Sequence, residues 1–240
     1  MRTVVVLAGG LGSRVAHLTG AGQPKALLPV AGHAFIDVKL AQLATAGAHV
    51  AILLTGHGRN VLEGHLRGLR IRDLEIAWYD DGPELLGTGG AIAAVREHLP
   101  ETFWITYGDT LVDAPMADVE ATLGDGQDGV MTVLENRDRW ARSNVAVDDD
   151  LVVRYDKDAG SGALEWIDYG LLVMRQAAFE GFTAGSAFDL MQPIQAAVAR
   201  RRLGAFAVTE RFHDIGTERS WRETDEWAQR SRLLERIGLA

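Results

Sequence analysis

The sequence contains no cysteine in its 240 residues. This absence excludes disulfide bonds, thiolate metal sites and a cysteine nucleophile. No apolar run reaches the ~18 residues that a membrane-spanning helix requires, so we expect no membrane partner. The N-terminus has only a short apolar run before its glycines, which is not the pattern of a secretory signal peptide. We therefore expect a cytoplasmic protein.

Positive charge is also scarce. The chain has 33 acidic and 24 basic residues, which gives a formal net charge of −9. This sign argues against a nucleic-acid partner, because phosphate backbones attract basic surfaces. Lysine occurs only at Lys25, Lys39 and Lys157. A chain with so few lysines is expected to use some of them for a chemical function. Lys39, within a predicted helix, is interpreted as structural.

The order of apolar patterns predicts an α/β fold. Strand-like and helix-like segments alternate up to about residue 110, and a periodic helical segment that begins at Ile36 is closed by Gly47. This alternation predicts a Rossmann-like doubly wound, mainly parallel (mixed) sheet with helices on both faces. The predicted strands of this part are 3–7, 49–56, 74–80 and 102–110. Such sheets bind ligands beyond the carboxyl ends of their strands.

The second half has a different pattern. Short strands joined by polar links predict small antiparallel excursions, and one long helix is predicted from Glu218 to Leu239. No internal repeat, low-complexity tract or long linker interrupts the chain. We therefore expect a single domain over residues 1–240.

The stretch "VVVLAGGLGSRV" is a glycine-rich loop after a predicted strand. The dinucleotide fingerprint would need a third glycine at Val15, and the Walker pattern would need a Lys-Ser or Lys-Thr pair. A third form fits: backbone N–H groups of Gly9, Gly10 and Gly12 bind a triphosphate, and Arg14 adds positive charge. A tight turn before a helix is the structural alternative.

The next stretch, "QPKALLPVAG", places Pro24 before Lys25. Proline restricts the backbone, so this lysine is held in one direction. A solvated surface lysine is the alternative interpretation.

These two stretches and three later ones together resemble a known signature. "LAGGLGSR…QPKALLPVAG" is followed in order by "LLGTGGAI", "YGDT" and "FHDIGT". The set resembles the sugar-1-phosphate nucleotidyltransferases, also called nucleotide-sugar pyrophosphorylases. The nearest groups are the heptose-1-phosphate guanylyltransferases and the N-acetylmuramate-1-phosphate uridylyltransferases. The resemblance runs from about Thr3 to Thr217.

The resemblance implies an enzyme that condenses an NTP with a sugar-1-phosphate, giving an NDP-sugar and pyrophosphate. It implies Mg²⁺-dependent in-line attack on the α-phosphate, for which positioning and charge neutralisation matter most. A heptose- or hexose-type sugar-1-phosphate is the implied substrate. The nucleotide-binding half would be about residues 1–112 and the sugar-phosphate-binding half about 113–240.

The family's functional residues map onto this sequence by motif. The catalytic residues implied are Arg14, Lys25 and Asp109, and the Mg²⁺ ligands implied are Asp109 and Asp214. The nucleotide-binding residues implied are Leu7, Ala8, Gly9, Gly10, Gly12, Ser13, Arg14, Lys25, Glu84, Gly87 and Thr88. The sugar-phosphate-binding residues implied are Gly108, Asp156, Lys157, Asp168, Tyr169 and Gly170.

Several of these residues also have structural interpretations. Asp109 with Thr110 could cap a turn, Asp214 could cap the final helix, and Thr88 could cap a helix N-terminus. Lys157 could be a surface lysine.

The sequence departs from the family pattern most clearly at Asp168-Tyr169, where many relatives have Asn-Ala or Asn-Thr. An ionised aspartate only accepts hydrogen bonds, so it favours a sugar that presents hydroxyl donors. The sugar, the base, the pathway and the oligomeric state stay open, and a homodimer through one of the last helices is one option. A cytidylyltransferase for a non-sugar phosphate and a non-catalytic nucleotide-sugar-binding regulatory module are the alternative functions.

Overall fold

A computed structural model describes residues 1–240 except residues 11, 21–22, 57, 81–85 and 240. The chain forms two compact units, and each is assembled from separate stretches of sequence. Unit 1 comprises Met1–Leu85, Thr106–Asp113 and Phe212–Ala240; unit 2 comprises Leu86–Ile105 and Ala114–Arg211. The C-terminal stretch thus belongs with the N-terminal one, whereas the sequence interpretation divided the chain into consecutive halves at residue 112.

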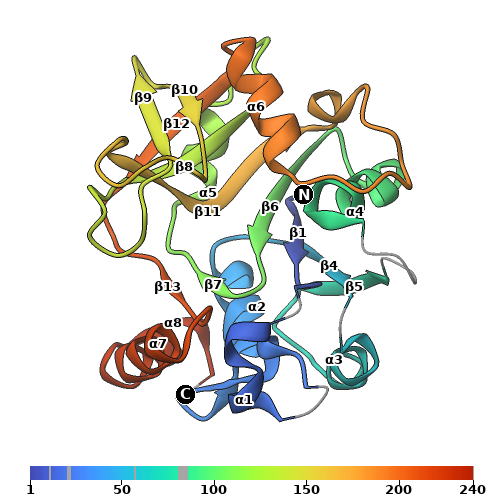
Figure 1. The fold of residues 1–240 in the computed structure, drawn as a ribbon. Coiled ribbons are helices and arrows are strands. Elements are labelled where there is room, and N and C mark those ends of the chain that lie inside the picture. Colours follow the sequence, from blue (N-terminus) through green and yellow to red (C-terminus); the bar gives the residue numbers. More distant parts are fainter. Residues whose placement is uncertain (11, 21–22, 57, 81–85, 240) are drawn as a thin grey trace. The chain divides into compact units, whose positions relative to one another are not determined.

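Unit 1 is built on three parallel strands in the order β5 (Glu75–Asp80), β4 (Val50–Thr55) and β1 (Thr3–Leu7) (Figure 1). The middle of β1 is completely buried: Val4 and Val6 have no exposed surface. A continuous β-branched run is the pattern expected for a parallel strand covered on both faces.

Helix α2 (Phe35–Thr45) is the central helix of unit 1 and is buried on nearly every side. Gly47, with φ +96°, follows its end, as the sequence predicted. The other helices of unit 1 are α1 (Ala16–Thr19), α3 (Arg59–Leu66), α7 (Glu218–Arg230) and α8 (Leu233–Ile237), with the short 3-10 helices η1 (Ser13–Val15) and η2 (Lys25–Leu27). Two short antiparallel ladders complete it: β2 (Pro29–Val30) with β3 (His33–Ala34), and β7 (Thr110–Leu111) with β13 (His213–Asp214).

The long C-terminal helix predicted from the sequence is interrupted. Ser231 has extended backbone (φ −82°, ψ 160°), which ends α7 and separates it from α8. Its Oγ accepts a hydrogen bond from the Leu233 N–H (3.3 Å), so this serine satisfies a donor at the start of the next helix. In the sequence, the helix break is indicated only by this serine, because the apolar helical periodicity continues on both sides of it.

Unit 2 contains a mixed sheet whose strands follow the order β6-β11-β8-β12-β10-β9 (Figure 1). Its strands are β6 (Thr102–Tyr107, whose last two residues belong to unit 1), β8 (Gly129–Glu135), β9 (Val145–Asp148), β10 (Leu151–Tyr155), β11 (Trp166–Arg175) and β12 (Leu203–Val208). Its helices are α4 (Gly87–Val95), η3 (Arg96–His98), α5 (Met116–Ala121), η4 (Gln176–Phe179) and α6 (Met191–Ala199).

Antiparallel pairing dominates the described ladders of unit 2. Among the ladders whose register the structure describes here, β8 with β12 runs parallel, whereas β11 with β8, β11 with β9, β10 with β12 and β9 with β10 run antiparallel. The β9–β10 hairpin turns at Asp149 and Asp150, which both have positive φ (46° and 60°), as a two-residue hairpin turn requires. The α/β class is therefore confirmed, and the mainly parallel arrangement holds for unit 1.

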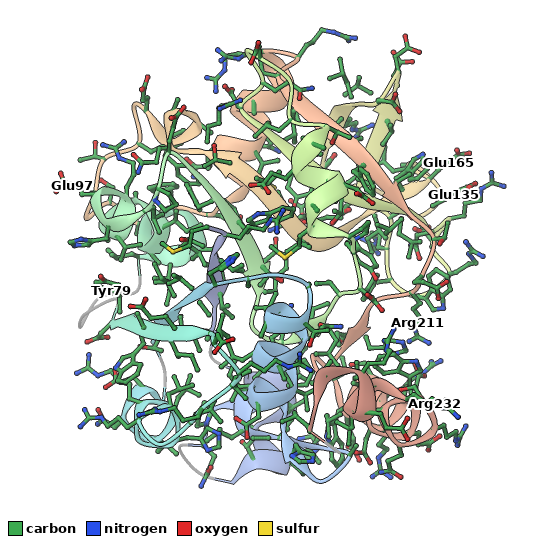
Figure 2. All side chains as sticks on the ribbon, turned by 180° about the vertical axis from the view of Figure 1, so that it is seen from behind. Tyr79, Glu97, Glu135, Glu165, Arg211 and Arg232 are labelled. Carbon is green, nitrogen blue, oxygen red and sulfur yellow. The ribbon has the colours of Figure 1, made fainter. Side chains whose placement is uncertain are left out.

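Charged side chains cover the surface of each unit. Glu97, Glu135 and Arg232 are exposed and point outward (Figure 2). Among the residues that the structure describes, no helix has the length and apolar character needed to cross a bilayer.

Alanine substitutions at two helical glycines should change the stability of the protein in opposite directions. In α4, a Cβ on Gly90 would clash with the Ser186 carbonyl oxygen. Gly90→Ala should therefore destabilise the protein by about 1–3 kcal/mol. In α3, a Cβ on Gly64 would meet nothing within 4 Å, so Gly64→Ala should stabilise by about 0.5–1 kcal/mol. Urea unfolding measures both changes; shifts of the same sign would contradict this packing.

Candidate nucleotide site

The loop after β1 carries the glycine motif in unit 1. Gly12 has φ +60°, a conformation that other residues rarely adopt, and it immediately precedes η1. A Cβ on Gly56 would lie 2.9 Å from the Gly9 carbonyl oxygen, so the base of the loop packs on a second glycine. A Cβ on Gly10 would meet nothing within 4 Å. The loop thus combines a packed base with backbone that a ligand can approach.

Lys25 packs against this loop. Pro24 is extended (φ −68°, ψ 140°) directly before it, as the sequence suggested. A Cβ on Gly12 would lie 3.4 Å from the Lys25 Cβ, so the aliphatic part of the lysine runs beside the loop. Its Nζ lies 2.5 Å from Asp109 Oδ2, and the two side chains are only 20% and 24% exposed. The lysine is therefore held by an ion pair at the loop.

Asp109 and Asp214 are joined through one short antiparallel ladder. Asp214 of β13 pairs with Thr110 of β7, and the Ile215 N–H donates to the Asp109 carbonyl oxygen (3.0 Å). Thr110 Oγ1 also donates to Asp109 Oδ1 (3.1 Å). The "GDT" and "HDIGT" motifs, about a hundred residues apart in sequence, are thus neighbours in unit 1.

The Asp214 carboxylate is fixed through one of its oxygens. Oδ1 accepts hydrogen bonds from Ser220 Oγ (2.7 Å) and the Gly216 N–H (2.8 Å). Within the described part of the chain, Oδ2 has no hydrogen-bond partner. The N-cap of α7 is Thr217, which forms a capping box with Ser220. Capping this helix therefore does not require Asp214, the alternative that the sequence left open.

Arg14, which follows the glycine loop, extends its side chain toward the segment around Asp214 and Gly216. A Cβ on Gly216 would lie 3.0 Å from Asp214 Oδ1 and 3.5 Å from an Arg14 Nη. Arg14 is exposed, and it makes no ion pair with any residue that the structure describes. An accessible guanidinium therefore lies beside Gly216 and one of the two carboxylates.

These contacts close a ring within unit 1, which we name the contact ring. Gly12 packs on the Lys25 side chain, which forms the ion pair with Asp109. The Asp109 carbonyl oxygen accepts a hydrogen bond from the residue before Gly216, and Gly216 lies beside Arg14. Arg14 lies two residues after Gly12 in the starting loop. The ring brings together one backbone loop, two cations and two carboxylates.

Gly108 has a packing role beside the contact ring. Its N–H donates to the Leu7 carbonyl oxygen (2.9 Å), and a Cβ there would lie 2.9 Å from that oxygen and 3.1 Å from Ala8 Cα. Only glycine lets the segment before Asp109 approach the end of β1 this closely. Its predicted sugar-phosphate contact stays a prediction.

The donor set fits Mg²⁺ bound together with a polyphosphate. The described residues contain no group of three or more His, Cys, Asp or Glu side chains that could enclose a metal ion by themselves. Mg²⁺ commonly uses one or two carboxylates together with substrate phosphates and water. Asp214 lies in the β7–β13 ladder and Asp109 directly precedes β7, so two carboxylates are present that suit this ion.

Lys39 is a buried structural residue, as the sequence interpretation had it. The side chain is completely buried in α2, and its Nζ donates to Thr106 Oγ1 (2.8 Å) and the Thr110 carbonyl oxygen (2.6 Å). Burial lowers the pKa of Lys39 from 10.5 to about 7, against the opposing effect of the Asp109 charge. The available signal was a rare lysine inside an apolar helical pattern.

The "LGTGG" residues lie in unit 2 and pack against its own chain. Gly87 has φ +69°, and a Cβ there would lie 2.6 Å from the Phe188 carbonyl oxygen. Thr88 Oγ1 accepts a hydrogen bond from the Leu190 N–H (2.9 Å) and does not cap α4. Glu84 lies outside the described residues.

Asp156 and Lys157 also lie in unit 2, with partners of their own. The Asp156 carboxylate accepts hydrogen bonds from the Arg154 guanidinium (2.8 Å) and the Asp158 N–H (3.0 Å), which lower its pKa. Lys157 Nζ lies 3.3 Å from Asp189 Oδ1. The second lysine of the predicted phosphate site is thus paired with an aspartate, as Lys25 is.

The departure at Asp168-Tyr169 coincides with an irregularity in β11. Asp168 accepts hydrogen bonds from the Tyr155 hydroxyl (3.1 Å) and the Gly170 N–H (2.9 Å), and Gly170 has φ +93°. The register with β8 shifts between Asp168 and Leu172. Tyr169 is completely buried, so its side chain belongs to the core of unit 2. Sugar binding by these residues stays a prediction.

The buried lysine makes a testable statement about stability and pH. The pKa of Lys39 is about 7 in the folded chain, against an ordinary 10.5. Between these values the unfolded chain binds more protons, so folding becomes more favourable as pH rises. Relative to Lys39→Met, the wild-type free energy of unfolding should increase from about pH 7 to about pH 10, by at most ~1.4 kcal/mol per pH unit.

Gln42→Met is the matched control for urea unfolding across this range. Gln42 is buried in the same helix, and its Oε1 accepts a hydrogen bond from the Val112 N–H (3.1 Å). Its loss should change stability by an amount that does not depend on pH. A pH-independent difference between wild type and Lys39→Met would contradict the lowered pKa.

Comparison with known proteins agrees with these motifs. Residues 4–225 match the family described as MobA-like NTP transferase domain. The N-acetylmuramate α-1-phosphate uridylyltransferase of Caulobacter vibrioides is 34% identical over 127 residues, which are 48% of this chain and 52% of that protein. The D-glycero-α-D-manno-heptose 1-phosphate guanylyltransferase of Campylobacter jejuni is 22% identical over 219 residues, 88% and 93% of the two chains.

A solved structure shares the fold. The HddC protein of Yersinia pseudotuberculosis, crystallised with GMP-PN, has a TM-score of 0.78 at 22% identity, covering 94% of this chain and 99% of that one. The chain spans about half the length of the Caulobacter relative in their alignment. The family predicted from the sequence motifs is confirmed, because the family match extends over most of the sequence. The chain belongs to the MobA-like NTP transferase domain family.

Proposed function

We propose that the chain is a nucleotidyltransferase that condenses an NTP with a sugar-1-phosphate to give an NDP-sugar and pyrophosphate. The observation that carries this proposal is the contact ring, which places the glycine loop, Lys25, Arg14 and both predicted metal carboxylates together in unit 1. The similarity to a uridylyltransferase and a guanylyltransferase for sugar-1-phosphates supports the same reaction class.

In this reaction an oxygen of the sugar phosphate attacks the α-phosphorus of the NTP. A new P–O bond forms, the bond from the α-phosphorus to the oxygen bridging to the β-phosphorus breaks, and pyrophosphate leaves with the electron pair. Both partners are anionic, so the reaction needs positive charge and in-line alignment more than a strong acid or base. The contact ring supplies positive charge through Arg14 and Lys25.

We assign the β- and γ-phosphates to the glycine loop and Arg14. The open backbone at Gly10 and the left-handed turn at Gly12 let N–H groups approach phosphate oxygens closely. Arg14 is exposed, so binding a phosphate costs it little desolvation, and its planar guanidinium matches phosphate oxygens.

We assign the α-phosphate to Lys25. Its Nζ contacts Asp109 in the structure, and a triphosphate presents more negative charge than a single carboxylate. The ammonium can therefore exchange one anionic partner for another through rotation of its own side chain. Asp109 and Asp214 would hold Mg²⁺, which would neutralise charge on the phosphate oxygens.

We assign the sugar-1-phosphate to unit 2 residues around Lys157 and Asp168. Hexose- and heptose-type sugars are the proposed substrates, since the two curated relatives are named for N-acetylmuramate and heptose phosphates. An ionised carboxylate such as that of Asp168 only accepts hydrogen bonds, which favours a sugar that presents hydroxyl donors.

Pyrophosphate release in Mg²⁺ tests the reaction. Each common NTP is combined with a panel of hexose- and heptose-1-phosphates, and one pairing should give turnover. Asp109→Asn should lower kcat by at least about two to three orders of magnitude, because it removes one carboxylate charge from the metal site.

Asp113→Asn is the matched control for this experiment. Asp113 is exposed and forms a surface ion pair with Arg236 (3.1 Å). Such pairs contribute about 0–1 kcal/mol, so activity should stay close to that of wild type. Normal turnover by Asp109→Asn would refute its metal role, and NTP binding without turnover across the panel would favour the regulatory module.

Lys25→Met separates catalysis from binding. The variant keeps the aliphatic stem that packs on Gly12 but loses the charge. Because the ammonium would meet charge that develops at the α-phosphate, kcat should fall by about 10²-fold or more while the NTP dissociation constant changes much less. Single-turnover rates and equilibrium NTP binding measure the two effects. A loss confined to binding would move Lys25 out of the chemical step.

A further inference from the structure

Lys39 lies underneath the turn that presents Asp109. Its side chain has no exposed surface. Its Nζ donates to two acceptors, Thr106 Oγ1 at 2.8 Å and the Thr110 carbonyl oxygen at 2.6 Å. These acceptors lie three residues before Asp109 and one residue after it. One lysine nitrogen therefore contacts the chain on both sides of this turn.

Packing alone does not explain a lysine at this position. α2 is buried around nearly its whole circumference, and its neighbouring buried positions include Ile36, Val38, Leu40 and Leu43. Burying an amine costs free energy unless its hydrogen bonds and charge are compensated, and an apolar side chain would avoid that cost. The acceptors and the nearby Asp109 charge supply the compensation.

The contacts of Lys39 are also linked to the second carboxylate, that of Asp214, through a strand pairing. Thr110, whose carbonyl oxygen Lys39 holds, pairs with Asp214 in the β7–β13 ladder. Fixing Thr110 thus fixes the register in which the two carboxylates are presented. Two of the chain's three lysines thus contact the segment around Asp109. Lys25 pairs with the Asp109 carboxylate, and Lys39 donates a hydrogen bond to the carbonyl oxygen of the next residue, Thr110.

We propose that Lys39 is a positioning residue, which holds the Thr106–Thr110 turn so that Asp109 and Asp214 present their carboxylates to a metal-bound NTP. This inference rests on the proposed function, because it assigns Lys39 a role in that metal site. Lys39 touches neither substrate nor metal and acts only through the turn.

Binding of Mn²⁺–NTP, followed by water proton relaxation, tests the proposal without turnover. Wild type is screened against the common NTPs, and the tightest is used for the variants. Lys39→Met should weaken Mn²⁺–NTP binding by about 10–100-fold, the usual effect of losing a residue that orients a metal ligand. Hydrogen exchange of residues 106–111 should accelerate in the same variant.

Gln42→Met is again the matched control. It removes a buried hydrogen bond from the same helix to the same segment, at Val112, but leaves both bonds at the Asp109 turn. Mn²⁺–NTP affinity should stay within about twofold of wild type. Equal affinity of Lys39→Met and wild type would overturn the proposal, even if exchange accelerated, because Lys39 would then only fill the core.

Two further outcomes are separable. If wild type binds no Mn²⁺–NTP, the proposed function itself fails, and the role of Lys39 fails with it. If Lys39→Met does not fold, the near-isosteric Thr106→Val removes one of the two acceptors and should weaken binding by about threefold or more. Wild-type affinity in that variant would overturn the proposal.

Discussion

The ion pair between Lys25 and Asp109 is the constraint on which the candidate site depends. It joins residues 84 positions apart and is mostly shielded from water. Removing either partner would leave a charge in a half-buried place, where it is less well solvated than at the surface. The pair therefore holds the glycine loop side of unit 1 against the β7–β13 ladder. Gly12 and Gly216 then place the loop backbone and Arg14 around it.

Much of the fold could be predicted because apolar runs bounded by turn residues limit the choices. The strand 3–7 and the helix that ends before Gly47 were located from pattern alone. The pattern could not give the direction of pairing in unit 2, since that depends on turns such as Asp149-Asp150, whose positive φ is rare for aspartate. The pattern also did not predict the helix break at Ser231. A serine does not disturb helical periodicity in the sequence, and the hydrogen bond from the Leu233 N–H to its Oγ is visible only in the structure.

The glycines show how far motif reasoning reaches. A glycine in a motif indicates that something approaches the backbone closely, but the sequence does not say what. At Gly10 the space beside the backbone is open, which agrees with a ligand site. At Gly87 and Gly108 the space is taken by the chain itself, by the Phe188 carbonyl and by the end of β1. Glycines of these motifs therefore lie beside open space in one place and against packed chain in another.

Charge follows the same rule of local arrangement. The chain carries a net charge of −9, yet Arg14 and Lys25 stand against only Asp109 and Asp214 in the contact ring. An anionic ligand responds mainly to charges within about 10 Å, because salt screens more distant ones. An acidic protein can therefore hold a triphosphate. Lys39 is a further amine close to Asp109. Its acceptors lie 67 and 71 residues away in sequence, so only the folded chain reveals this arrangement.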